Sequence, residues 1–173
     1  MTSFRIPSIP LLATAIVLWC SPLAEAGGAS KKAHEHGVAQ LSIAAEGQLV
    51  TLQFESPADE IYGFEHAPRN PGESEKQQAG LERLKSTASE MIRFDESLGC
   101  AFKERTAEVK MDGPKHSEVH AVFKVECGKS LKGTMISIDV SKNFPSIKRI
   151  RVQILGDSKQ DAKVLRKKGS VQL

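Results

Sequence analysis

The amino-acid sequence predicts an α+β fold with mostly antiparallel strands. Three observations indicate this class. Apolar and polar residues alternate in several short runs, turn-forming residues separate these runs, and one amphipathic helical segment interrupts them. Without the first 26 of its 173 residues the chain is long enough for one ordinary domain or two small subdomains.

Residues 1–26 have the layout of a cleavable signal peptide. Arg5 supplies an early positive charge, an apolar run (LLATAIVLW) follows, and a small-x-small triplet stands at residues 24–26. The run is about nine residues long whereas a membrane span needs about twenty, so we expect no stable membrane anchor. A buried N-terminal helix is one alternative, and lipid anchoring at Cys20 is another. Lipid anchoring is disfavoured because lipoprotein processing requires a small residue before the cysteine, whereas Trp19 is bulky. We predict cleavage after Ala26 and a mature protein that works outside the cytoplasm.

The segment 37–57 predicts a β-hairpin, because alternating residues flank a Glu46-Gly47 turn. A loop rich in Pro, Gly and Asn follows. Ser74 and Gln77 are then typical of a capping box that begins a helix. The apolar side of this helix consists, at helical spacing, of Leu81, Leu84, Ala88, Met91 and Ile92.

The second half of the chain predicts further strands. Residues 102–111 form one strand, the run Asp-Gly-Pro at 112–114 breaks it, and alternation resumes with one apolar face and one polar face. A turn at 128–133 precedes two more strands, and after a polar turn a last strand lies near Val171. Each half opens with a histidine-containing segment followed by a hairpin, which indicates a weak internal repeat.

The two cysteines that remain after cleavage, Cys100 and Cys127, predict one disulfide in an oxidising compartment, with reduced buried thiols as the alternative. The formal net charge is +3 at pH 7, and only 5% of the residues are aromatic. This composition argues against nucleic-acid binding. A basic stretch that includes Arg149 and Arg151 could contact an anionic surface, but we expect it to be a solvated face.

All five histidines fall in three short stretches, which are His34 and His36, His66, and His116 and His120. Neutral imidazole is the commonest transition-metal ligand, and zinc also accepts oxygen from neighbouring carboxylates, here Glu35, Glu65 and Glu118. Strand residues two apart lie about 6.6 Å from each other on one face, so His34 and His36 can share an ion. His116 and His120, about 13 Å apart, cannot do so unless the strand bends. Ordinary surface histidines are the alternative, and His66 has either a ligand role or a structural role in its turn.

Four runs carry a family resemblance: HEHGVAQL at 34–41, ESPA at 55–58, GFEHAP at 63–68 and HSEVHA at 116–121. They resemble the zinc-regulated periplasmic zinc-binding proteins of Gram-negative bacteria, the ZrgA-like proteins, over nearly the whole mature chain. The resemblance implies a periplasmic accessory carrier or reservoir in zinc acquisition and homeostasis. It also implies two α/β subdomains in a pseudo-twofold arrangement, which we place at residues 27–111 and 112–173. The implied partners are the zinc ion (Zn²⁺) and a zinc importer or its solute-binding protein.

The sequence departs from that family in one respect. Members commonly carry a long His- and Asp-rich tract before the strand that starts here at His116, whereas this chain has only residues 110–115 in its place. Zinc would therefore rest on three or four ligands drawn from His34, His36, His116, Glu118 and His120, with His66 as a further candidate. One mixed site or two separate sites are possible. Binding should fade below about pH 6, because imidazole must be neutral to ligate.

Two other functions compete with zinc carriage. An envelope structural or interaction protein would need none of the histidines. A zinc-dependent hydrolase is the less favoured alternative, because the sequence contains no HExxH helix and no nucleophile elbow. We therefore expect a protein that is not an enzyme.

Overall fold

The computed structural model describes residues 35–156 and 160–173. The predicted signal peptide and His34 lie outside these ranges. Within them the elements, in chain order, are β1 (Val38–Glu46), β2 (Leu49–Pro57), α1 (Asp59–Tyr62), α2 (Pro71–Ser86), α3 (Ala88–Met91), β3 (Ile92–Arg93), the 3-10 helix η1 (Glu96–Leu98), β4 (Ala101–Asp112), β5 (His116–Glu126), β6 (Met135–Asp139), β7 (Arg149–Gly156), β8 (Gln160–Leu165) and β9 (Lys168–Gln172). None of the helices in this part of the chain is long and apolar enough to cross a membrane.

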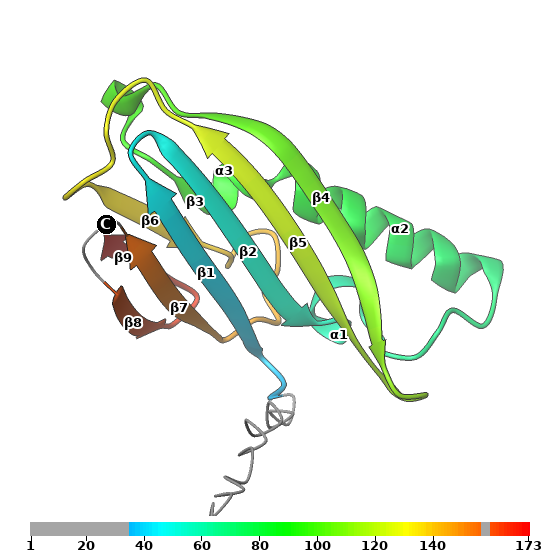
Figure 1. Cartoon of the computed structure of the whole chain (residues 1–173). Helices are drawn as coiled ribbons and strands as arrows, with labels where there is room; N and C mark the ends of the chain where they lie inside the picture. The colour runs from blue at the N-terminus through cyan, green and yellow to red at the C-terminus, as the bar shows by residue number, and fades with distance from the viewer. Residues whose placement is uncertain (1–34, 157–159) are drawn as a thin grey trace, which may run out of the picture. The chain divides into compact units, whose positions relative to one another are not determined.

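Six strands form the larger sheet, in the order β4-β5-β2-β1-β7-β8 (Figure 1). Neighbouring strands are antiparallel except for β1 and β7, which run parallel. A smaller antiparallel sheet has the order β3-β6-β9. The predicted predominance of antiparallel pairing is therefore confirmed, with strands outweighing helices within the α+β class.

Both sheets combine strands from the two segments predicted as subdomains. In the larger sheet, β5 and β7 of the second segment lie on either side of β2 and β1 of the first. In the smaller sheet, β3 of the first segment pairs with β6 of the second. The pseudo-twofold arrangement of two subdomains is not confirmed by this topology and stays a prediction.

The hairpin of β1 and β2 forms as its sequence indicates. Gly47 adopts a φ of 58° in the two-residue turn, and Glu46 pairs with Leu49 across it. Alternation then directs Leu41 and Ile43 inward, where they are fully buried. One continuous core joins this inner face to the helices and the smaller sheet, which lie behind the larger sheet in Figure 1, and its members include Leu52, Phe54, Leu84, Met91, Phe123, Ile136, Ile138, Ile150 and Val171.

The helix begins one turn earlier than the predicted capping box. Asn70 is the N-cap residue, and its side-chain oxygen accepts a hydrogen bond from the backbone N–H of Glu73 at 3.0 Å. Pro71 occupies the first helical position, where its missing N–H leaves no bond unmade. The predicted cap, Ser74, instead lies inside α2, and the helix ends at Ser86, so the apolar positions beyond it belong to α3 and β3.

Cys100 and Cys127 form the predicted disulfide. The bond links the start of β4 to the end of β5, two neighbouring strands in which Ala101 pairs with Glu126. Two strands were not predicted. β3 lies where the helical pattern was expected to continue, and the sequence around residues 160–165 indicates a polar turn. These residues form the edge strand β8, which is exposed along most of its length and therefore lacks an alternating pattern.

Candidate metal centre

A four-residue turn immediately before β1 presents the first described histidine. The Val38 N–H donates to the carbonyl of Glu35 at 3.1 Å, and Gly37 has a φ of 77°. Glycine tolerates this conformation, and a Cβ at this position would also lie 3.1 Å from Cγ of Lys148. Residues 35–38 therefore form a turn that needs its glycine and that holds His36 at the start of the larger sheet.

Two acidic residues of α1 contact the turn that carries this histidine. Nδ1 of His36 lies 3.0 Å from Oδ2 of Asp59, and Oε1 of Glu60 accepts the N–H of Gly37 at 2.6 Å. One ligand atom from each of His36, Asp59 and Glu60 lies within 4.8 Å of the others. Figure 1 shows the start of β1 and α1 at the same end of the sheet. The hairpin thus brings a histidine and two carboxylates together.

Glu65 joins the group from the loop after α1. Its Oε2 lies 2.6 Å from Nδ1 of His116, and its Oε1 lies 3.8 Å from Nδ1 of His36. The hydroxyl of Ser117 donates to the backbone carbonyl of Glu65 at 2.6 Å. The Glu65 carboxylate therefore lies between two histidines. Its side chain is only 9% exposed, so it is largely shielded from water. We call the five residues His36, Asp59, Glu60, Glu65 and His116 the α1 cluster.

Three carboxylate oxygens of the α1 cluster are buried without a hydrogen-bond partner in the described part of the chain. They are Oδ1 of Asp59, Oε2 of Glu60 and Oε1 of Glu65. An unsatisfied buried polar group costs about 1–3 kcal/mol, and more when it is charged. Ionised carboxylates in one place also repel each other. A divalent cation would offset both costs, which makes these oxygens the strongest sign of a metal centre.

The spacing and the donor types suit zinc. In a tetrahedral site with bonds near 2.0–2.1 Å, neighbouring ligand atoms lie about 3.4 Å apart. The separations of His36 Nδ1 from Asp59 and from Glu65, 3.0 and 3.8 Å, bracket this value. Mixed nitrogen and oxygen donors favour a transition metal over calcium or magnesium, which prefer oxygen alone. The His36 side chain is 64% exposed, so an ion can approach from solvent.

His66 makes a separate set of contacts. Its ring stacks on Phe64 with centroids 5.0 Å apart, and its Nδ1 lies 3.0 Å from the carbonyl oxygen of Ala67. The same nitrogen lies 3.7 Å from a carboxylate oxygen of Glu73 near the start of α2. Of the two roles that the sequence leaves open, these contacts support the structural one.

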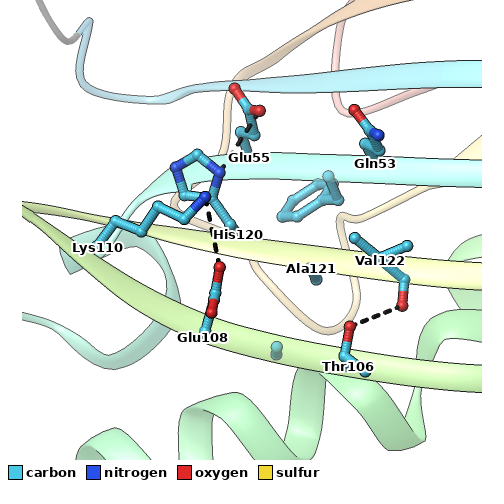
Figure 2. Close-up of a pocket in the computed structure, with 10 residues that line it drawn as sticks. Gln53, Glu55, Thr106, Glu108, Lys110, His120, Ala121 and Val122 are labelled. Atoms are coloured by element: carbon cyan, nitrogen blue, oxygen red, sulfur yellow. Dashed lines mark hydrogen bonds and ion pairs between the residues drawn. The ribbon is translucent and has the colours of Figure 1, made fainter.

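Glu118 and His120 belong to a second group on the outer face of the larger sheet. His120 Nε2 lies 3.2 Å from Glu118, and its Nδ1 lies 3.5 Å from Glu55 of β2. Figure 2 shows the His120 ring between Glu55 and the side chains of β4, at a pocket of about 340 Å³. Glu108 pairs in register with His120 from β4. His116 and His120 therefore contact different carboxylates, as the four-residue spacing indicates.

Sequence reasoning missed two members of the α1 cluster, Asp59 and Glu60, and noted Glu65 only as a carboxylate beside a histidine. A usable signal was present in the hairpin register. Gln40 pairs with Glu55, and the same antiparallel register continued beyond the strands places His36 opposite Asp59. The length of the hairpin turn fixes this register, so the sequence could have indicated that His36 lies near Asp59.

Comparison with known proteins agrees with the resemblance noted in the sequence. Residues 33–172 match the model of a family described as ZrgA family zinc uptake protein. None of the curated proteins gives a significant match to the chain. The matched range contains the whole α1 cluster and the second group around His120.

Proposed function

The chain belongs to the ZrgA family of zinc uptake proteins, and from this premise we propose that it binds zinc outside the cytoplasm as an accessory carrier or reservoir. The observation that supports this proposal most directly is that one carboxylate oxygen each of Asp59, Glu60 and Glu65 is buried without a hydrogen-bond partner among the described residues, in a cluster that also contains His36 and His116. Cys100 and Cys127 are oxidised to a disulfide and supply no thiolate. The family description names zinc uptake, and the sequence contains no HExxH helix and no nucleophile elbow, so a carrier is favoured over a hydrolase.

We assign the ligands within the α1 cluster as follows. His36, Asp59 and Glu60 offer ligand atoms that all lie within 4.8 Å of one another, and Glu65 offers a fourth donor through its Oε1, 3.8 Å from Nδ1 of His36. His116 orients the Glu65 carboxylate through its contact with Oε2. Hydrogen bonds to a ligand from a second layer of residues commonly fix its direction and raise metal affinity.

The remaining predicted ligands keep narrower roles in this proposal. His34 lies outside the described residues, two positions before His36, and stays a candidate ligand of the same ion. Glu118 and His120 are candidates for a separate, weaker site with Glu55. The signal segment supports export to the periplasm, where a zinc importer or its solute-binding protein would receive the ion.

Calorimetric titration of the mature chain with zinc tests this function. The parent should bind zinc, and the variant His36→Ala with His116→Ala should lose at least tenfold in affinity. The matched variant Glu118→Gln with His120→Ala removes one carboxylate and one histidine from the second group and should keep the tighter site. Circular dichroism checks that both variants remain folded.

Three outcomes would contradict the proposal. A parent protein that does not bind zinc would favour the envelope structural role instead. If the variant His36→Ala with His116→Ala is folded and binds zinc with parental affinity, the zinc site does not depend on these two histidines. Turnover of a hydrolysable ester by the zinc-loaded parent would favour the hydrolase alternative.

A further inference from the structure

We propose that Arg149 and Arg151 are positioning residues for the α1 cluster, acting through Glu35 to hold His36 in place. The inference rests on the proposed zinc site and adds residues that do not touch the ion. The sequence had suggested other roles for all three, namely an oxygen donor for Glu35 and a solvated basic face for the arginines. Their contacts in the structure differ from both expectations.

Both arginines bind one carboxylate. Nη2 of Arg149 donates to Oε1 of Glu35, and Nη2 of Arg151 donates to Oε2. The two arginines alternate with the fully buried Ile150 on β7, so their side chains lie together on the outer face of the sheet. β7 is the parallel neighbour of β1, with Arg149 opposite Val38. The turn before β1 is thus tied to the strand beside it.

The same turn is also fixed through its backbone on the other side of His36. The carbonyl of Gly37 accepts the N–H groups of Lys148 and Arg149 at 2.7 and 2.9 Å, and its own N–H donates to Glu60. His36 therefore stands between two anchored residues. Segments at the edge of a domain stay ordered only where they are tied down. Loss of the Glu35 anchor should let His36 leave the carboxylates it contacts.

Stability alone does not explain this pair of contacts. The side chains of Glu35, Arg149 and Arg151 are 42%, 52% and 45% exposed, and exposed ion pairs contribute little to folding. Two cations near a zinc site also repel the ion. A carboxylate engaged by two planar guanidinium groups is, however, held in one direction, which is what a positioning role requires.

Removing the arginines gives opposite results under the two roles of Glu35. If Glu35 positions His36, the variant Arg149→Gln with Arg151→Gln should bind zinc about tenfold more weakly than the parent, at the lower end of what second-layer residues contribute. If Glu35 is itself a ligand, freeing it and removing two cations should strengthen binding. The sign of the change therefore decides between them.

The experiment is zinc calorimetry on the mature chain with a matched control. Lys103→Gln with Lys124→Gln removes the same charge and two exposed ion pairs of the same sheet, and should bind within twofold of the parent. Glu35→Gln should weaken zinc as much as the arginine variant, and all three substitutions together should weaken it no further, because they break one interaction. Lysine at both arginine positions should restore part of the affinity.

The salt dependence of zinc affinity distinguishes a positioning role of the arginines from a purely structural one. At 1 M salt the Debye length falls to about 3 Å, so the difference between the parent and the arginine variant should shrink. Unchanged or stronger binding by the folded arginine variant overturns the proposal, and Glu35→Gln repeats the test should that variant not fold. Failure of the parent to bind zinc overturns the proposed function instead.

Discussion

Replacing Glu65 with glutamine should make the metal-free protein more stable while removing its response to zinc. The side chain keeps its size, and the amide oxygen can still face His116. The substitution removes one negative charge from a cluster with two other carboxylates. It also removes the charge on the buried Oε1, which has no hydrogen-bond partner among the described residues. A residue retained for binding is here expected to cost folding stability.

The magnitudes follow from burial and linkage. A neutral group is cheaper to bury than a charged one, so we expect a gain of about 1 kcal/mol in the metal-free state. For a chain of this size that corresponds to a rise of about 2–4 °C in Tm. At a free zinc concentration of about 100 times Kd, a single site stabilises the parent by about 2.7 kcal/mol. The parent should then gain about 5–10 °C from zinc, whereas the variant should gain almost nothing.

Scanning calorimetry of parent and variant, in chelator and in buffered zinc, measures both effects. Glu108→Gln is the control, because this carboxylate is 68% exposed and should alter neither Tm nor the zinc shift. The reasoning is refuted if the Glu65 variant melts below the parent in chelator and keeps the parental zinc shift. Glu65 would then be only a structural acceptor for His116.

Three further predictions concern other parts of the molecule. Replacing Cys100 and Cys127 with serine should lower the free energy of unfolding by about 3.5 kcal/mol in urea titrations, from the chain entropy of the 27-residue separation, with zinc affinity retained. His66→Ala should lower stability by about 1 kcal/mol through loss of ring stacking, while calorimetry shows zinc affinity within twofold of the parent. The hydroxyl of Ser141, and then its backbone N–H, hold the pKa of Asp139 below its ordinary value, so Ser141→Ala should raise that pKa in an NMR titration. The charged carboxylate stabilises the fold above its unfolded-state pKa, and this contribution is lost as pH falls through the folded-state pKa, so the variant should lose less stability on acidification.

The strands could be predicted where one face alone is buried. β1, β2, β5 and β7 each alternate because their inner residues reach the core while their outer residues face solvent. β8 gave no such signal, since nearly all of its side chains are exposed. The helix start was misplaced because Ser74 and Asn70 are both suitable caps one turn apart, and the decisive residue was Pro71, which favours the first helical position.

The site could be predicted only in part, because histidine spacing carries no information about tertiary contacts. His36 and its carboxylate Asp59 follow from the hairpin register. Glu65 and His116 meet only after the loop beyond α1 packs against the start of β5, which no local pattern indicates. His66 stands next to Glu65 in sequence, yet its contacts are with its own turn and with α2.

The parallel pairing of β1 with β7 sets the order in which the metal centre can form. Glu35 and Arg149 are 114 residues apart, so the turn that carries His36 is completed by contacts of very high sequence separation. Contacts of this kind form slowly, because a long loop must close before they contribute any stability. β7 is also among the last strands of the chain, far beyond the turn that carries His36. The cluster should therefore become competent for metal only at the end of folding, after β7 has paired with β1.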